Sequence, residues 1–203
     1  MIVIATNNEH KLNEYKEILD NNVDIKCIND FNIKIEPCES GHTLVENAFI
    51  KAKYTYDELL KRNFIKRNDY VVADDTGLFI NFLDNGPGIY SARFLHPLNQ
   101  EDKNRIIVDM MKGINNIEAR KAYFKTIIFV YSDSISKAFE GKVDGYISDS
   151  ISGNGGFGYD NIFIPIKYKD TKKTYADIGD EKNDISHRRL AINKMLKFME
   201  SEE

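Results

Sequence analysis

Residues 1–19 read MIVIATNNEHKLNEYKEIL, and this stretch decides the class of fold. It opens with a continuous apolar run, residues 2–5, of the kind found in strands that are buried on both faces. A polar loop follows, after which the apolar residues between Leu12 and Leu19 recur at helical spacing and form one stripe. The order strand, loop and helix predicts an α/β fold. Because no basic segment precedes the apolar run, we interpret it as a core strand rather than a signal peptide.

The rest of the chain continues to alternate between strand and helix signals. Thr43 and Glu46 have the spacing of a capping box, which predicts a helix start. A second buried strand is predicted over residues 70–73, and alternating apolar residues predict strands over 121–132 and 137–147. We therefore expect one α/β unit over residues 1–203, with a mixed central sheet flanked by helices. The remaining predicted elements are a helix over 99–112, a strand over 162–164 and a last helix over 185–199.

The chain has 203 residues, of which 42% are hydrophobic and 30% charged, and its formal net charge is -4. This length suits one large domain or two tightly joined lobes, and the apolar fraction excludes a disordered chain. No apolar stretch approaches the ~18 residues that a membrane span needs. An acidic chain has no bulk attraction for polymeric nucleic acid or anionic membranes. Two cysteines, Cys27 and Cys38, cannot form a disulfide framework, which favours a soluble, cytoplasmic protein with reduced thiols.

The loop between the first strand and the first helix is a candidate anion site. Backbone N–H groups and the positive end of the helix dipole favour an anion there, and Lys11 adds a full charge. It is not a Walker loop, because the Gly-Lys-Ser/Thr sequence is absent. The alternative is an ordinary turn, since most strand-to-helix turns bind nothing. The residues concerned are Thr6, Asn7, Asn8, Glu9, His10 and Lys11.

Asp74 and Asp75 directly follow the predicted buried strand. Ligands of α/β proteins bind outside the carboxyl ends of the strands, which is where two such acids would stand. Side chains alternate along a strand, so the pair should point in different directions unless the chain turns. One acid would then hold a metal or base position while the other is structural. The alternative is an aspartate pair that caps a turn into Thr76 and Gly77.

Two further acids, Glu36 and Glu39, lie in the loop before the second predicted helix. Carboxylates from separate loops suit Mg²⁺, whose shell a substrate phosphate can complete. Loop acids that contact only solvent are the alternative.

Two later segments also carry polar or glycine-rich patterns. Residues 153–158 read GNGGFG, but a strand rather than a helix follows, so the dinucleotide-binding interpretation fails. These glycines would let the backbone approach a ligand while Phe157 or Tyr159 stacks on a base, or they form a simple flexible hairpin. His187 and Arg188 open the last predicted helix, where the dipole disfavours cations. That placement indicates either a site or a solvated face.

Six segments occur together in an order that is far more specific than any one of them. They read ATNN followed by Lys11, TLVENA over 43–48, ADDTGL over 73–78, GPGIYSAR over 86–93, FGYD over 157–160, and EK at 181–182 leading to SHR at 186–188. In this order, over nearly the whole chain, the sequence resembles the inosine/xanthosine triphosphate pyrophosphatases of the Ham1 family.

The resemblance implies an activity and an architecture. The activity is hydrolysis of non-standard purine nucleoside triphosphates, such as ITP, dITP and XTP, to the monophosphate and pyrophosphate, which cleanses the nucleotide pool. The architecture is a two-lobed α/β fold with the active site in a cleft between the lobes. Mg²⁺ as cofactor, a small-molecule nucleotide as substrate and a homodimeric assembly are also implied.

The resemblance assigns roles to particular residues. Asp75 is implied as the general base and, with Glu39, as a metal ligand, while Glu36 is a rival for Glu39. Residues 6–11 are implied as the triphosphate loop. The other implied substrate contacts are Thr76, Phe157, Gly158, Tyr159, Asp160, Lys182, His187 and Arg188. Of the cations, Lys11, Lys182 and Arg188 are expected to form a local positive cluster facing the triphosphate.

Four positions depart from the family pattern without removing an implied catalytic group. Asn7 replaces the usual Gly, and asparagine tolerates left-handed backbone better than most residues. Thr76 replaces Ser, Asn161 replaces a frequent Pro, and Asp177 replaces a Glu. The rival interpretations are a related pyrophosphatase for other modified nucleotides, a nucleotide-binding sensor that does not hydrolyse, and a structural module whose acids cap turns.

Overall fold

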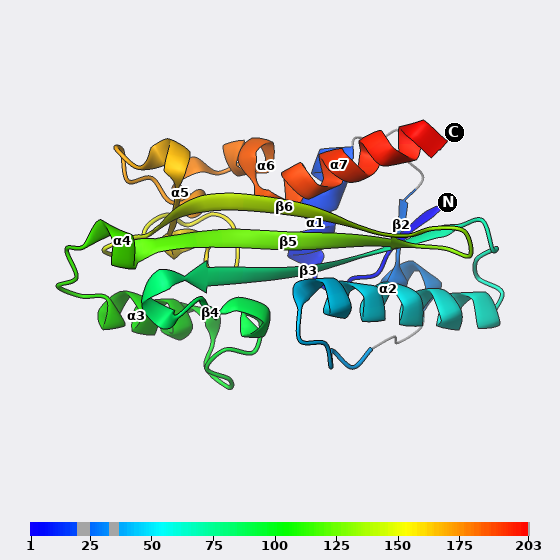
Figure 1. Ribbon diagram of the computed structural model, residues 1–203, viewed down its shortest axis with the longest axis horizontal. Helices are drawn as coiled ribbons and strands as arrows, with labels where there is room; N and C mark the ends of the chain where they lie inside the picture. The colour runs from blue at the N-terminus through cyan, green and yellow to red at the C-terminus, as the bar shows by residue number, and fades with distance from the viewer. Residues whose placement is uncertain (20–24, 33–36, 203) are drawn as a thin grey trace. The chain divides into compact units, whose positions relative to one another are not determined.

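In a computed structural model of the chain, residues 1–19, 25–32 and 37–202 are described, and they contain a mixed seven-stranded sheet (Figure 1). The strand order is β2-β1-β3-β5-β6-β7, and β4 pairs with β3. β1 is parallel to β2 and β3, whereas β4 is antiparallel to β3 and β7 to β6. The predicted α/β class with a mixed sheet is confirmed. The strands are β1 (Ile2–Ile4), β2 (Ile25–Cys27), β3 (Tyr70–Ile80), β4 (Gly86–Pro87), β5 (Lys121–Tyr131), β6 (Ser136–Ile147) and β7 (Phe163–Pro165).

Four helices lie close to where the sequence predicts them, whereas three short helices, over residues 117–120, 175–178 and 181–185, were not predicted. The last predicted helix is divided, because Ser186 adopts an extended conformation that ends α6 before α7 begins. The α-helices of the described residues are α1 (Glu9–Leu19), α2 (Leu44–Lys61), α3 (Gln100–Met110), α4 (Ile117–Arg120), α5 (Tyr175–Ile178), α6 (Glu181–Ile185) and α7 (His187–Glu202).

The chain divides into two compact units. Unit 1 comprises Met1–Asp75, Thr126–Gly141 and Arg188–Glu203, and unit 2 comprises Thr76–Lys125 and Lys142–His187. The expected single domain over residues 1–203, and the expected cleft between two lobes, stay predictions.

Unit 1 buries side chains on both faces of its strands. On one face, α1 and α7 pack against Ile128 and Val130 of β5. On the other face, Phe49 of α2 lies 5.2 Å from Phe129 between ring centroids. Successive strand residues point to opposite faces, so the two helix layers receive different residues of β5. The predicted alternation of apolar and polar residues is therefore lost over residues 127–130, all of which are buried.

Unit 2 is built around an aromatic cluster. The Phe124 ring lies 4.7 Å from the Phe163 ring and 5.9 Å from the Tyr175 ring, measured between centroids. Ile107 of helix α3 and Met111, directly after that helix, belong to the same core. In this half of β5 alternate residues are buried, as the sequence predicts.

Strand β3 is longer than predicted, and this corrects one interpretation of the aspartate pair. The sequence predicts a strand over residues 70–73 with a turn after it, whereas β3 runs on through Asp74 and Asp75 to Ile80. The extension pairs with β4, where Phe79 lies opposite Pro87. Gly77 permits this pairing, because a Cβ there would lie 2.5 Å from the Gly88 carbonyl oxygen. The two aspartates are therefore strand residues and cap no turn.

Helix α2 begins at the predicted capping box. The Thr43 hydroxyl accepts a hydrogen bond from the Glu46 N–H at 3.1 Å, and the Glu46 carboxylate accepts one from the Thr43 N–H at 3.1 Å. We expect Thr43→Ala to lower the free energy of unfolding by about 1 kcal/mol, because it leaves an orphan N–H in the first turn. Denaturant titration measures this, with Thr43→Ser, which keeps the hydroxyl, as the matched control. An equal loss in both variants would contradict the capping role.

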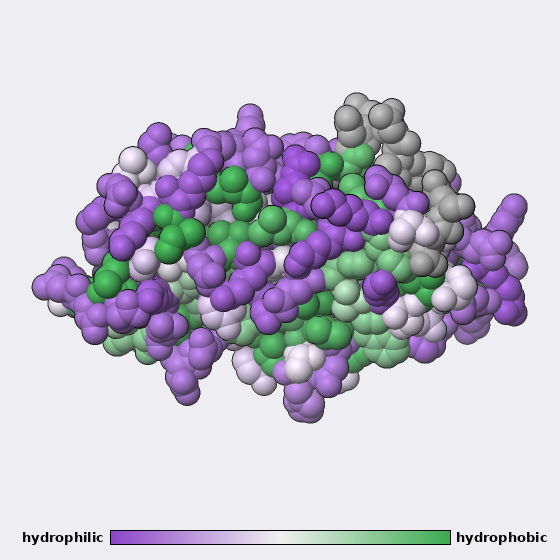
Figure 2. All heavy atoms as spheres, turned by 45° about the horizontal axis from the view of Figure 1, so that its top comes forward, coloured by the Kyte–Doolittle hydropathy of each residue, from purple (hydrophilic) through white to green (hydrophobic). Residues whose placement is uncertain are grey.

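The surface has mixed polarity. Figure 2 shows one face on which hydrophilic side chains predominate and apolar groups lie between them. Large apolar side chains that stay exposed, such as Tyr54, Tyr90 and Ile166, come from distant parts of the sequence. Within the described ranges, no helix combines the length and the apolar character needed to cross a membrane.

Candidate active site

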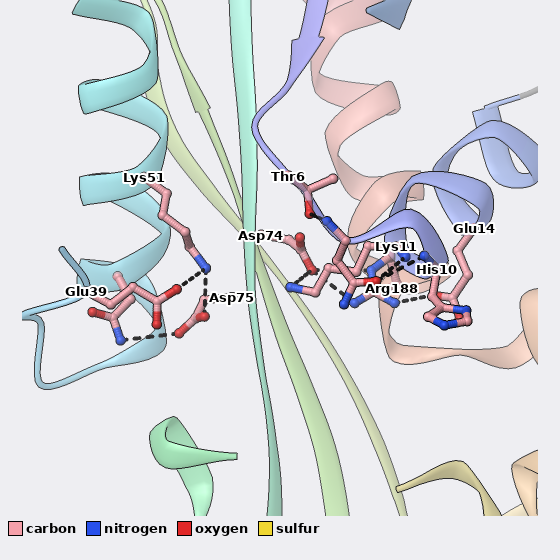
Figure 3. A network of polar contacts seen from close by, with 11 residues as sticks. Thr6, His10, Lys11, Glu14, Glu39, Lys51, Asp74, Asp75 and Arg188 are labelled. Carbon is pink, nitrogen blue, oxygen red and sulfur yellow. Dashed lines mark hydrogen bonds and ion pairs between the residues drawn. The ribbon is translucent and has the colours of Figure 1, made fainter. Parts of the chain in front are cut away.

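Asp74 and Asp75 stand at the point where the neighbouring strand β1 ends. The last paired residues are Ile4 of β1 and Val72 of β3, and the Ala5 N–H donates to the Val72 carbonyl at 2.7 Å. Two residues further along β3, the aspartates point to opposite sides of the strand (Figure 3). The predicted divergence of the pair is confirmed. The two acids lie beside the carboxyl end of β1, and not at the end of their own strand, because β3 continues to Ile80.

Asp75 belongs to a compact polar group with Glu39 and two residues of α2 (Figure 3). The Lys51 ammonium lies 2.8 Å from Asp75 Oδ1 and 3.2 Å from Glu39 Oε1, so the two carboxylates converge on one cation. Asn47 donates to Asp75 Oδ2 at 3.4 Å and accepts from the Gly41 N–H at 2.9 Å. Asn47 therefore links Asp75 to the loop that carries Glu39.

The protonation of this group follows from its burial. Burial raises the pKa of Asp75, and the nearby Glu39 carboxylate adds to the rise, while Lys51 and Lys11 oppose it. Burial alone would lower the pKa of Lys51, but the carboxylates of Asp75, Asp74 and Glu39 outweigh it and raise that pKa. Asp75 is thus a better proton acceptor than an ordinary aspartate, next to a lysine that stays charged.

On the other side of β3, Asp74 joins α1 to α7. Its Oδ2 atom lies 3.0 Å from the Lys11 ammonium and 3.0 Å from Arg188 Nη2. The Arg188 guanidinium also pairs with Glu14 of α1. Asp74, Glu14 and Arg188 are all buried, with Arg188 at 0% exposure. A planar guanidinium suits two carboxylates at once, so Arg188 holds three elements of unit 1 together.

Electrostatics keeps this second group ionised. Burial would raise the pKa of Asp74, but Lys11 and Arg188 outweigh burial and hold it well below its usual range. Burial lowers the pKa of Lys11, and the Asp74 carboxylate partly offsets that effect. Asp74 is therefore held charged inside its ion pairs, whereas the pKa of the buried Asp75 carboxyl is raised. A structural role for Asp74 and a chemical role for Asp75 stay predictions.

The candidate triphosphate loop is organised by its own side chains. Asn8 Oδ1 accepts from the N–H groups of His10 and Lys11 at 3.0 and 3.3 Å, so it caps α1. Asn8 itself donates its N–H to Thr6 Oγ1 at 3.1 Å. Asn7, Asn8, Glu9 and His10 are exposed, as an anion-binding loop requires.

In unit 2, Lys182 and Asp160 form a buried ion pair. The ammonium lies 2.7 Å from Asp160 Oδ2, the same oxygen that accepts from the Phe157 N–H at 2.8 Å. The ammonium also lies over the Phe157 ring, 4.7 Å from its centroid. One carboxylate thus fixes both the lysine and the backbone of the candidate base-binding segment.

The other predicted contacts of unit 2 surround this pair. His187 stacks on Phe124 at 4.6 Å between centroids, and the Tyr159 hydroxyl donates to the Ser91 carbonyl at 2.7 Å. Burial raises the pKa of Tyr159 to about 12, so this hydroxyl stays a donor. Thr76 lies on β3, directly after Asp75.

The expected positive cluster stays a prediction, and the structure adds a partner for each of its members. Lys11 and Arg188 each pair with Asp74, and Lys182 pairs with Asp160, so every one of these cations already has a carboxylate beside it. The sequence pattern could not predict these partners, which come from other elements of the chain. The positive charges of the three side chains are held in place and are balanced by these carboxylates.

Three members of the site were not predicted as such: Asn47, Lys51 and Glu14. A signal for the first two exists, because Asn47 and Lys51 interrupt the apolar stripe of α2 at i, i+4 spacing. Polar residues on the buried face of a helix indicate a polar partner inside the protein. Glu36, the predicted rival of Glu39, lies outside the described residues.

The fold and the site together define a class of protein. It is an α/β protein in which β1 ends beside two buried carboxylates of β3 that are paired with lysines, a set of groups suited to a polyanion and a cation. The chain belongs to the Ham1 family, whose sequence model matches residues 2–198.

Comparison with known proteins gives the same family over the full length. The chain is 41% identical over 198 residues to the dITP/XTP pyrophosphatase of Clostridium perfringens, covering 95% of this chain and 94% of the relative. It is 39% identical over 202 residues to the dITP/XTP pyrophosphatase of Thermoanaerobacter pseudethanolicus, covering 98% and 96%. The solved structure of the Staphylococcus aureus Ham1 protein is similar with a TM-score of 0.81 and 36% identity, covering 100% of this chain and 99% of that one.

Proposed function

We propose that this protein hydrolyses non-standard purine nucleoside triphosphates, namely ITP, dITP and XTP, to the monophosphate and pyrophosphate. The observation that carries the proposal is the convergence of Asp75 and Glu39 on one cation position, 2.8 and 3.2 Å from the Lys51 ammonium. Family membership and the activity for which the relatives are named support it.

The donor set of this group fits Mg²⁺. Two hard carboxylate oxygens face one position, and Mg²⁺ is usually held by one or two carboxylates together with substrate phosphates and water. Among the described ranges of the chain, no three His, Cys, Asp or Glu side chains gather at one point. Glu39 and Asp75 would hold the ion. When bound, it would neutralise phosphate charge and make an attacking water more acidic.

The chain's own residues would supply the remaining chemistry. Asp75 would accept the proton of the water that attacks the α-phosphorus, and the bond to pyrophosphate would break as the new P–O bond forms. Lys11 and the N-terminus of α1 would stabilise the charge that develops on pyrophosphate. Asn47 would keep Asp75 in place. Lys51 would balance the carboxylates before the substrate arrives. No covalent intermediate is required, since such transfer depends mainly on positioning and charge.

Base selection would rest on hydrogen-bond donors. Hypoxanthine and xanthine present an acceptor at position 6, where adenine presents an amino donor, so a donor in the pocket favours the keto bases. Arg188 stays a proposed contact, although its guanidinium would have to leave Asp74 or Glu14 to reach a base. Backbone donors of residues 157–160 need no such change. Guanine shares the keto group, so its rejection would depend on its 2-amino group finding no acceptor or too little room.

The purified protein is expected to release pyrophosphate from ITP and XTP faster than from GTP or ATP at fixed Mg²⁺. We expect kcat/KM for ITP to exceed that for GTP by at least about tenfold, the effect of one badly placed polar group. A panel of triphosphates that includes modified pyrimidines measures this. Equal turnover of GTP and ITP would overturn the selection argument. Preference for a modified pyrimidine would instead favour a related pyrophosphatase for other modified nucleotides. Nucleotide binding without hydrolysis would favour a nucleotide-binding sensor.

Further properties belong to the same proposal. The substrate is a free nucleotide and not a nucleic acid polymer, in keeping with the net charge of -4. A homodimer and a cytoplasmic location, where nucleotides are made and used, stay predictions.

A further inference from the structure

The candidate base-binding segment is held by a side chain from a distant part of the chain, Asn104 of α3. Asn104 Nδ2 donates to the Gly158 carbonyl at 2.8 Å and to Asn161 Oδ1 at 2.6 Å. Its own Oδ1 accepts from Gln100 Nε2 at 2.8 Å. Asn104 is 1% exposed, so this amide is fixed inside unit 2.

The arrangement uses the amide fully. A primary amide has two N–H donors and one carbonyl oxygen, and here both donors and the oxygen have protein partners. Gln100, one turn earlier on α3, also forms a hydrogen bond with the Tyr159 side chain. Two successive turns of α3 thus contact the segment that contains Gly158 and Tyr159.

Asn161 supplies a bond that the usual residue of the family could not. A proline at this position would offer no side-chain acceptor. Asn161 offers its Oδ1 atom to Asn104, and its backbone carbonyl accepts from the Ser152 N–H at 2.9 Å. The segment is therefore anchored directly at Gly158 and again at Asn161.

The bond to Gly158 determines the direction of a backbone donor. The carbonyl and the N–H of one trans peptide unit point in opposite directions. With the Gly158 carbonyl directed at Asn104, the N–H of Tyr159 points away from α3. Gly158 has φ +63, and a Cβ built there would meet open space. Glycine has more backbone freedom than other residues, so the side-chain bond from Asn104 restrains a peptide that could otherwise adopt other orientations.

We propose that Asn104 is a positioning residue for base selection, which acts by fixing the peptide between Gly158 and Tyr159 in the segment that reads the purine. This proposal rests on the proposed function. A fixed backbone donor favours the keto oxygen of a non-standard purine over an amino group, and a peptide that rotates would lose this preference.

The test is Asn104→Asp, which keeps the shape of the side chain but removes both donors. The Asn161 amide can rotate to donate to the new carboxylate, whereas the Gly158 carbonyl cannot. We expect KM for ITP to rise and the ratio of kcat/KM for ITP to that for GTP to fall about tenfold, with kcat for ITP within about twofold of the wild type. Asn116→Asp, an exposed cap of α4 in the same unit, is the matched control and should leave the ratio unchanged.

A folded Asn104→Asp protein with the wild-type ratio would overturn the proposal. If that variant does not fold, Asn161→Ala carries the test, because Asn161 is only partly buried and its side chain holds the Asn104 amide that bonds Gly158. We then expect the ratio to fall two- to threefold by the loss of a weaker, indirect anchor, and an unchanged ratio overturns the proposal. Wild-type protein that shows no preference for ITP would instead overturn the proposed function, and this inference with it.

Discussion

Replacing Asp75 by asparagine is expected to abolish pyrophosphate release from ITP, with kcat lowered by about 10³-fold, the usual contribution of a general base. Asparagine has the same shape but cannot accept a proton from water. It also leaves Glu39 as the one remaining carboxylate beside the Lys51 ammonium in this group, so the affinity for Mg²⁺ should fall as well. Single-turnover measurement of pyrophosphate at saturating ITP separates the chemical step from substrate binding.

The control for this variant is Asp84→Asn. Asp84 lies in a turn of unit 2 with φ +50 and is exposed, and asparagine accepts this left-handed backbone at least as well as aspartate. Its activity should match the wild type. Full activity in Asp75→Asn would show that another group takes the proton and would overturn the catalytic assignment.

Arg188→Met is expected to lower the free energy of unfolding by about 3–5 kcal/mol, the cost of breaking a buried ion pair from one side. The guanidinium is fully buried, and its removal would leave the carboxylates of Glu14 and Asp74 without the group that joins them. Lys11 would still contact Asp74, so the larger loss would fall on Glu14. Denaturant titration followed by circular dichroism measures the change.

Two further variants identify the cause of that loss. In Arg188→Met with Glu14→Gln, the buried carboxylate that has lost its contact with Arg188 is made neutral, so the double variant should be more stable than Arg188→Met alone. Arg105→Met removes an exposed arginine that pairs with Glu101 one turn away, and it should change stability by less than about 1 kcal/mol. If Arg188→Met lowered the free energy of unfolding no more than Arg105→Met does, the buried ion pairs of Arg188 would not stabilise the fold.

Much of the fold could be predicted from the sequence, because local patterns decide it. The apolar run at residues 2–5 and the capping box at Thr43 and Glu46 each predict an element through contacts within a few residues, and both are found. The end of β3 could not be predicted, since its extension depends on pairing with β4 and on the close approach of Gly77 to Gly88. Such pairing is a property of the folded chain.

In the site, too, local features could be predicted from the sequence and distant contacts could not. The opposite orientation of Asp74 and Asp75 could be predicted because it needs only the period of a strand. Their partners could not, because Lys51 reaches Asp75 across 24 positions and Arg188 reaches Asp74 across 114. The segments that carry the family resemblance include Asp74, Asp75 and Arg188 but not Lys51. Only the packing of α2 and α7 shows which carboxylate each cation contacts.

The position of two acids on consecutive residues of β3 restricts how the chain can vary in length. A strand that gained or lost one residue between the last pairing with β1 and Asp74 would exchange its two faces. The carboxylate that now meets Arg188 would then face Lys51 and Glu39, and Asp75 would lie on the side of α1 and α7. Insertions in the loop before β3 cost less, because the entropy of loop closure grows slowly with length. Within the strand, only changes by an even number of residues would keep each acid on its own side.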